Sequence, residues 1–434
     1  MRRILLFLLA FLLAPGLAAP VPGFAATTTT HKSTHQQQAH QQKAKHRAQK
    51  RVVKKHSAMR KRTARRGVVR GHVVGKRSSA AARRHVVRAH VVRRARYRRR
   101  YYERFTAKSF ATRDLTAGDV TGGEDPLVRQ AAIDALGRMN GTVVAIDPSD
   151  GRILAMVNQK LALSGGAEPC STIKISVALA ALEEGIITRD KRVQLGRHYA
   201  VNLTEALAHS NNLYFETVGR RLGFRRLHQY EKEFGLGELA GWNIRGEQPG
   251  VYPDRAIPER KGGVGRMCSF GEGVAMTPLQ LGALVAAVAN GGTLYYLQHP
   301  TKPEELLNFR PRVKRRLNIA RILPELQPGM EAVVRYGTAR SLRENFRAFP
   351  VMGKTGTCSD EGTRFGWFAS YADTRYGRVA TVVFLEGGRP TFGPKAAELT
   401  GIFYRDLYQG SYFGAEAPQE AMSPANSATA AAQP

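Results

Sequence analysis

Three short patterns of serine, lysine and threonine could together act on an amide. They follow one another along the chain as Ser171-Thr172-Ile173-Lys174, Ser210-Asn211-Asn212 and Lys354-Thr355-Gly356-Thr357. Each of the first two arises about once or twice by chance in a chain of this length, whereas KTG followed by Ser or Thr is expected on the order of once in a hundred such chains. The ordered set therefore indicates a serine nucleophile with lysine partners.

Ser171 is the candidate nucleophile and Lys174 is the candidate general base. A serine hydroxyl attacks an amide only when a base takes its proton, and residues three apart share one face of a helix. Lys174 must be neutral part of the time to act as a base, and both burial and a second cation such as Lys354 would lower its pKa. The alternative for an isolated SxxK pattern is a serine that caps a helix and a solvated lysine.

Beyond these motifs, the chain resembles the transpeptidase domain of penicillin-binding proteins. That family is related to the serine β-lactamases and carries SxxK, S-[DN]-N-like and K-[TS]-G motifs in this order. The resemblance covers residues 130–410 or so. It extends to GTVVAIDPSDGRILAM (141–156), LTEALAHSNNLYFETVG (203–219), FGEGVAMTPLQLGALVAAVANGG (270–292), Gly337-Thr338-Ala339 and Phe365-Gly366-Trp367-Phe368.

The second motif is expected to handle the scissile amide. Given the resemblance and the chemistry of the side chains, Ser210 would relay a proton to the leaving amine, and Asn212 would hydrogen-bond the amide of the substrate. We interpret Asn211 as structural. The alternative is that Ser210 and Asn212 only form a turn or a helix interruption.

The third motif is expected to bind the terminal carboxylate of the substrate. Lys354 would attract this carboxylate with the help of the hydroxyls of Thr355 and Thr357, and Gly356 would leave room for the acyl group against the strand. By analogy with the family, the backbone N–H groups of Ser171 and Thr357 form the oxyanion hole. The alternative is that these residues only begin a strand. We expect neither a metal nor a cofactor.

The resemblance implies a serine-type D,D-transpeptidase of peptidoglycan. Such an enzyme forms an acyl-enzyme at Ser171 with D-Ala-D-Ala stem peptides and binds β-lactam antibiotics covalently. A D,D-carboxypeptidase and a β-lactam or muropeptide sensor stay open as alternatives, because the motifs do not define the acceptor. A hydrolytic β-lactamase is disfavoured, since no segment offers the extra acidic residue that its deacylation water requires. A scaffold that carries a degenerate domain is disfavoured by the intact motifs.

Two of the three cysteines flank the predicted site. Cys170 precedes the candidate nucleophile, where the family commonly has glycine, and Cys358 follows the third motif. Their positions are compatible with a disulfide or a redox switch, and equally with two small buried thiols. With Cys268 as the third cysteine, any pairing leaves one thiol free.

The N-terminal residues have the pattern of an export signal. Arg2 and Arg3 precede an apolar run over residues 4–13, followed by Pro15 and a small-residue stretch. Because a membrane span needs about 20 apolar residues, residues 1–26 are predicted to be a cleaved signal peptide or else an anchor. In both cases the body would lie outside the cytoplasm, in the periplasm or at the outer face of the cytoplasmic membrane.

The formal charge of +33 is concentrated in one segment. Residues 31–105 hold 26 Lys or Arg against a single acid, Glu103. Residues 27–124 are therefore predicted to be a disordered low-complexity linker, because like charges at this density repel and few apolar groups are available for burial. The segment is interpreted as a tether to anionic lipid or acidic wall polymers, or as a solvated spacer, and not as a nucleic-acid-binding region. Residues 414–434 are predicted to be a disordered tail.

Hydrophobic periodicity begins near Asp125 and predicts a catalytic domain over residues 125–413. We expect an α+β fold of the α/β-sandwich kind, with a mostly antiparallel sheet flanked by helices and an all-helical subdomain. Trp367 and Phe368 are expected in its core. The predicted helices are 126–138, 171–184, 203–222, 277–289 and 396–408, and the predicted strands are a hairpin over 141–157, 364–371 and 379–385.

Overall fold

The computed structural model describes residues 106–374, 377–389 and 391–414. The predicted leader, the basic segment over residues 31–105 and all but the first residue of the predicted tail lie outside these residues. Within the described part of the chain, no helix is long and apolar enough to cross a membrane.

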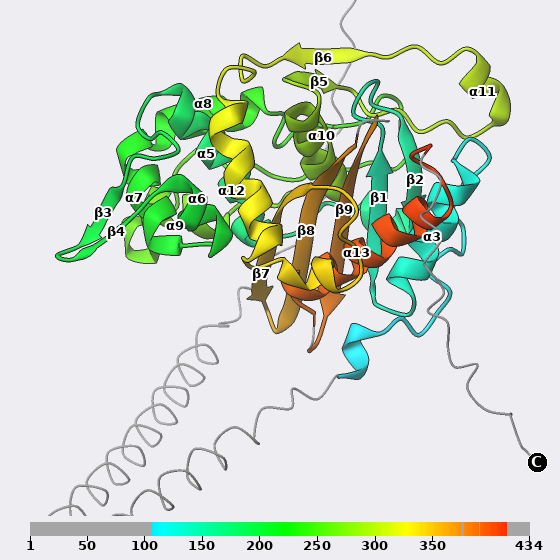
Figure 1. The fold of residues 1–434 in the computed structure, drawn as a ribbon, viewed down its shortest axis with the longest axis horizontal. Coiled ribbons are helices and arrows are strands. Elements are labelled where there is room, and N and C mark those ends of the chain that lie inside the picture. The colour runs from blue at the N-terminus through cyan, green and yellow to red at the C-terminus, as the bar shows by residue number, and fades with distance from the viewer. Residues whose placement is uncertain (1–105, 375–376, 390, 415–434) are drawn as a thin grey trace, which may run out of the picture. The chain divides into compact units, whose positions relative to one another are not determined.

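The centre of the fold is a five-stranded antiparallel sheet in the order β2-β1-β9-β8-β7 (Figure 1). Its strands are β1 (Gly141–Ile146), β2 (Ile153–Val157), β7 (Val351–Asp360), β8 (Thr363–Thr374) and β9 (Gly377–Gly387). The register pairs Gly141 of β1 with Leu385 of β9. The sheet therefore joins the two ends of the folded body, as the sequence predicts.

Helices cover both faces of the sheet. They are α3 (Pro126–Leu136) and α13 (Gly393–Gln409), which pack together, and α10 (Pro278–Ala289). The hydroxyl of Tyr404 in α13 lies 3.3 Å from that of Ser370, whose cross-strand partner is Thr381. Gly282 of α10 instead approaches Val382, the next residue of β9. Because successive strand residues face opposite sides, α10 and α13 lie on opposite faces.

A group of helices lies beside β7, the edge strand of the sheet (Figure 1). It consists of the 3₁₀ helix η2 (Cys170–Ile173), α5 (Lys174–Glu183), α6 (Leu203–Ala208), α7 (Asn212–Leu222), α8 (Phe224–Glu233) and α9 (Gly263–Phe270). Helix α12 (Leu323–Arg335) contacts both α6 and β7. The predicted α+β architecture, a mostly antiparallel sheet flanked by helices, is thus confirmed.

The remaining elements are short and peripheral. They are α4 (Gln159–Ala162), α11 (Pro303–Leu307), η1 (Ala107–Ser109), η3 (Glu259–Lys261), η4 (Arg340–Glu344), and the hairpin strands β3 (Val193–Gly196), β4 (Tyr199–Val201), β5 (Thr293–Tyr295) and β6 (Val313–Arg316).

The helix at Thr277 forms as the sequence predicts. Thr277 caps it, Pro278 occupies the first turn, and Gln280 completes a capping box. Trp367 and Phe368 are fully buried, as expected of core residues. Helix α12 was not predicted, because Pro328 within it breaks the periodic pattern by which helices are recognised.

Ordered contacts begin before Asp125, the residue at which the sequence placed the start of the folded body. Ser109 donates a hydrogen bond to the carbonyl of Arg389 (2.7 Å), and buried Glu124 pairs with both Arg129 (2.7 Å) and His299 (2.9 Å). Residues in the segment 106–124 therefore make specific contacts with the folded body. Charge composition cannot reveal these contacts, because the partners lie far along the chain. The division into domains stays a prediction.

Candidate active site

Ser171 lies in a 3₁₀ turn that leads directly into α5. The predicted helix over 171–184 thus begins with tighter geometry, from Cys170 to Ile173, before the α-helical part starts at Lys174. In a 3₁₀ turn, side chains three residues apart are in line along the axis. Lys174 Nζ accordingly lies 2.8 Å from Ser171 Oγ.

Lys174 is completely buried and surrounded by oxygen atoms. Besides Ser171, its Nζ contacts the carbonyl oxygen of Ser210 (3.1 Å), Ser210 Oγ (3.0 Å) and Asn212 Oδ1 (2.6 Å). Burial and then the charge of Lys354 hold the pKa of Lys174 well below its usual value, against an opposing effect of Glu216. The direction of this shift, and both of its causes, agree with the sequence-based expectation.

The contacts of Lys174 suit a neutral amine. The Ser210 carbonyl and Asn212 Oδ1 can only accept hydrogen bonds, so they can take both N–H groups of an uncharged lysine. The single lone pair then remains to accept one hydroxyl proton, from Ser171 or from Ser210. This arrangement prepares Lys174 to take a proton from either hydroxyl.

The helix predicted over residues 203–222 is interrupted at Ser210, so the prediction of one continuous helix was wrong. Ser210 adopts a left-handed backbone (φ 53°), and the N–H groups of Ser210 and Asn211 bond back to α6. The side chain of Asn211 then caps α7 by accepting from the N–H of Tyr214. Asn211 is thus structural, as expected. The interruption is what aims Ser210 at the two lysines.

Lys354 enters the site from β7 and is also completely buried. Its Nζ lies 2.9 Å from Ser210 Oγ and 2.9 Å from the carbonyl oxygen of Thr355. Burial lowers the pKa of Lys354 to about 7. The hydroxyl of Ser210 therefore bridges two lysines that come from opposite sides of the site.

The rest of the third motif has partners within the protein. The hydroxyls of Thr355 and Thr338 lie 2.6 Å apart, and the N–H of Gly393 donates to Thr357 Oγ1 (2.8 Å). A Cβ at Gly356 would lie 2.8 Å from the carbonyl oxygen of Pro169. The close packing of β7 on the turn before Ser171 therefore requires a glycine at this position even when no substrate is bound. The sequence-based expectation gave a different reason, namely room for the acyl group of the substrate.

Sequence reasoning missed two residues that border the site. The ring of Phe215 lies 5.6 Å from Lys174 Nζ, and Thr338 pairs with the hydroxyl of Thr355. Phe215 could have been predicted from the sequence. It follows Asn212 by three residues, so on a helix the two side chains lie on the same face. Thr338 stands in a stretch noted for its family resemblance, but only the fold brings it to Thr355.

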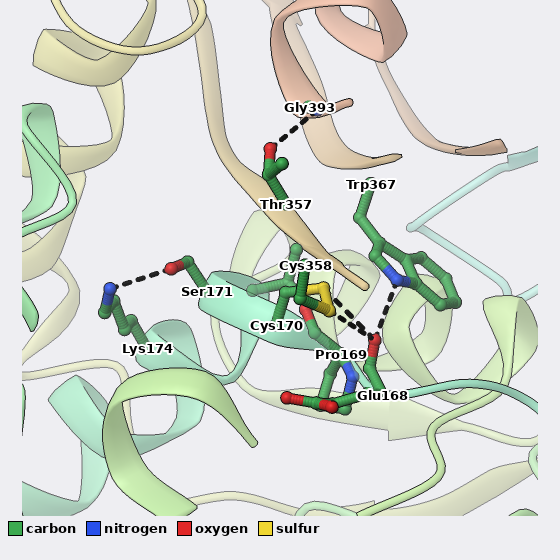
Figure 2. Close-up of a disulfide and its surroundings, with 10 residues drawn as sticks. Glu168, Pro169, Cys170, Ser171, Lys174, Thr357, Cys358, Trp367 and Gly393 are labelled. Carbon is green, nitrogen blue, oxygen red and sulfur yellow. Dashed lines mark hydrogen bonds between the residues drawn. A yellow bond between two sulfur atoms is a disulfide. The ribbon is translucent and has the colours of Figure 1, made fainter. Parts of the chain in front are cut away.

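Cys170 and Cys358 form a disulfide with their Cα atoms 5.6 Å apart (Figure 2). Of the two alternatives left by the sequence, the structure has the disulfide. Cys268 is a buried free thiol. Cys170 has a left-handed backbone (φ 51°), a conformation that costs a residue with a side chain roughly 1–2 kcal/mol relative to the right-handed region. Glycine would adopt this conformation without such a cost.

Comparison with known proteins agrees with this arrangement. Residues 141–407 match the family model described as the penicillin binding protein transpeptidase domain. The chain belongs to this family. The chain is 29% identical over 317 residues to stage V sporulation protein D of Bacillus subtilis, covering 61% of this chain and 48% of that protein.

A second relative is peptidoglycan D,D-transpeptidase MrdA of Acinetobacter baumannii. The two are 26% identical over 344 residues, covering 62% of this chain and 50% of that protein. The chain thus spans about half the length of these two curated relatives. Among solved structures, Pseudomonas aeruginosa PBP2 in complex with WCK 5153 superposes with a TM-score of 0.53 at 25% identity, covering 65% of this chain and 76% of that one.

Proposed function

We propose that this chain is a peptidoglycan D,D-transpeptidase that forms an acyl-enzyme at Ser171. The observation that carries the proposal is the buried chain of contacts from Ser171 through Lys174 and Ser210 to Lys354, with every step between 2.8 and 3.0 Å. It provides a nucleophile, a base, a proton relay and a cation within one site. Membership of the transpeptidase family supports the choice of D-Ala-D-Ala stem peptides as substrates.

In the first half-reaction, Ser171 Oγ attacks the carbonyl carbon of the penultimate D-alanine while Lys174 accepts the hydroxyl proton. The backbone N–H groups of Ser171 and Thr357 would stabilise the oxyanion that develops. The C–N bond then breaks as a proton passes from Lys174 through Ser210 to the leaving nitrogen, which departs as terminal D-alanine. Lys354, when charged, holds the carboxylate of that residue.

In the second half-reaction, an amine of a neighbouring stem peptide attacks the ester at Ser171. Lys174 takes a proton from this amine, and Ser171 leaves with a proton returned from Lys174. The products are a new peptide bond and the free serine. With water as the attacking group the same steps give a D,D-carboxypeptidase, which is the principal alternative activity.

Labelling with a fluorescent penicillin tests the nucleophile. We expect one stable adduct, which digestion and mass spectrometry place on the peptide containing Ser171, and no adduct in a Ser171→Ala variant. Ser149→Ala, in the turn between β1 and β2, is the matched control and should label like the wild type. Labelling of the Ser171→Ala variant at the wild-type rate would refute the proposal.

Incubation with a D-Ala-D-Ala stem peptide, with and without an amine acceptor, separates the alternatives. A transpeptidase forms the cross-linked product when the amine is present, whereas a carboxypeptidase only releases D-alanine. A protein that is labelled by penicillin but turns over neither substrate would instead be a sensor. Rapid hydrolysis of the penicillin adduct would indicate a β-lactamase.

We also propose that the protein acts outside the cytoplasm and that residues 31–105 bind anionic surfaces. The support is their composition, 26 Lys or Arg against one acid. Deletion of residues 31–105 is expected to abolish the salt-sensitive binding to vesicles that contain anionic lipid, or to wall sacculi, without changing penicillin labelling. Neutral vesicles are the control. Equal binding before and after deletion would leave the segment as a spacer.

A further inference from the structure

The disulfide links the two backbone positions that the proposed reaction uses most closely. Cys170 directly precedes Ser171, and Cys358 directly follows Thr357, although 188 residues separate the two cysteines in sequence. Ser171 and Thr357 are each one peptide unit from a bridged cysteine, a step of about 3.8 Å between Cα atoms. Figure 2 shows the sulfur pair between the turn that carries Ser171 and strand β7. The bond therefore limits the separation of the two expected oxyanion donors.

Cys170 has a backbone conformation that is unfavourable for a residue with a side chain. Its φ of 51° lies in the left-handed region, which β-carbon-bearing residues avoid. The residue just after it is the nucleophile, so any relaxation at Cys170 turns the N–H and the hydroxyl of Ser171. The covalent bond to Cys358 opposes that relaxation.

Noncovalent contacts hold the same turn without the disulfide. The indole N–H of Trp367 donates to the carbonyl of Glu168 (3.0 Å), and Thr172 Oγ1 donates to the carbonyl of Pro169 (2.6 Å). The Glu168 carbonyl also lies 3.4 and 3.8 Å from the two sulfur atoms. Because the bond from Trp367 joins the turn to strand β8, we expect the turn to stay attached to the sheet when the sulfurs separate and only its precise geometry to depend on the disulfide.

We propose that the Cys170–Cys358 disulfide positions the oxyanion hole, so that Ser171 is acylated rapidly in the oxidised protein and slowly in the reduced one. The inference rests on the proposed function, because it concerns the rate of the acylation step. The cysteines are positioning residues and contact no reacting atom. The same bond makes acylation sensitive to the redox state of the surroundings.

The disulfide is less deeply buried at one of its two cysteines. Cys170 is fully buried, but Cys358 is only partly buried and lies next to exposed Thr357 on the edge strand β7. A phosphine reductant attacks one sulfur and breaks the S–S bond. Water then supplies the oxygen of the phosphine oxide and two protons, leaving two thiols.

The decisive measurement compares penicillin acylation of the full chain before and after phosphine treatment, with the reagent removed. The measurement uses a Cys268→Ala variant, so that any thiols counted after reduction come from Cys170 and Cys358. We expect the limiting acylation rate to fall about tenfold on reduction with little change in the binding constant. Complete removal of an oxyanion donor typically costs about 10²–10³ in rate, and here the donors are displaced, not lost.

Two double variants test whether the backbone conformation at residue 170, and not only the loss of the disulfide, sets the acylation rate. Both Cys170→Gly/Cys358→Ser and Cys170→Ala/Cys358→Ser lack the disulfide, but only glycine adopts the left-handed backbone freely. We expect the glycine variant to be acylated faster than the alanine variant. The acylation rates of both variants should not change when reductant is added. Urea unfolding of each form shows whether the fold persists.

Equal limiting rates in oxidised and fully reduced protein would overturn the inference. So would equal rates for the glycine and alanine variants, or a loss that occurs only because the reduced protein unfolds. An oxidised protein that no penicillin acylates would instead refute the proposed function itself.

Discussion

The Ser210 hydroxyl lies between Lys174 and Lys354, 3.0 and 2.9 Å from their Nζ atoms, and the mechanism that we propose requires opposite charge states of the two lysines. Lys174 must be neutral to accept a proton, whereas Lys354 must be charged to attract a carboxylate. Burial lowers the pKa of both, and the charge on Lys354 lowers that of Lys174 further. A charged Lys354 therefore helps to keep its neighbour neutral.

The pKa of about 7 at Lys354 predicts how acylation depends on pH. Below this value the amine is charged and attracts the carboxylate of a penicillin, and above it the charge is lost. Acylation efficiency at low penicillin concentration, which reports the free enzyme, should therefore fall as pH rises from about 7 to 9. A Lys354→Arg variant keeps its charge, so its profile should lose this decline even though its absolute rate is lower. A wild-type efficiency that is constant over this range would contradict the assignment.

At the scale of elements, the junction between η2 and α5 rests on a buried carboxyl group of α8. Ser176 Oγ lies 2.8 Å from the carbonyl of Ile173 and 2.7 Å from Glu231 Oε1. Glu231 is fully buried near Tyr252 and Cys268, and burial raises its pKa to about 8 against the opposing hydrogen bond of Ser176. A protonated Glu231 can donate to Ser176, which then donates to Ile173 in the turn that carries Ser171.

This raised pKa makes stability depend on pH with a defined sign. Between about 4.5 and 8 the folded state retains a proton at Glu231 that the unfolded chain loses, so the free energy of unfolding should fall as pH rises. The slope from this group approaches about 1.4 kcal/mol per pH unit. Urea titrations of Glu231→Gln should lack this contribution. Glu233→Gln, on the same helix, is the control, and an identical slope in wild type and Glu231→Gln would refute the prediction.

At the scale of the whole molecule, residues 106–124 extend the folded body beyond the region that matches the family model. Arg129 of α3 pairs with Asp119 (3.0 Å) and Glu124 (2.7 Å), whose side chains are nearly inaccessible to solvent. Removing one partner of a buried ion pair leaves an uncompensated charge. This cluster therefore fastens the segment to β2 and α3.

An Arg129→Met variant should lower the free energy of unfolding by about 3 kcal/mol, because two buried carboxylates lose their cation. Penicillin labelling of the remaining folded protein should be unchanged, since the cluster does not touch the Ser171 site. Urea denaturation of the full chain measures the loss. The exposed pair of Arg189 and Asp190 provides the control, and Arg189→Met should unfold like the wild type. A similar stability for both variants would show that residues 106–124 are not fastened in this way.

By itself the sequence determined the features that depend on near neighbours along the chain. The three motifs, the capping box at Thr277 and the hairpin over 141–157 rest on spacings of a few residues, so they can be recognised without knowledge of distant partners. The spacing of Ser171 and Lys174 likewise ensured that the two side chains would meet, even though the turn between them is 3₁₀.

Tertiary structure decided everything that depends on partners distant in sequence. The break at Ser210, the disulfide in place of two thiols and the burial of Glu231 arise where helices pack on one another and on β7. The pattern over residues 203–222 predicted one continuous helix, but the folded chain has a left-handed turn at Ser210 that brings its hydroxyl between the two lysines. Only long-range packing sets the distances and the low dielectric that make these side chains a reactive site.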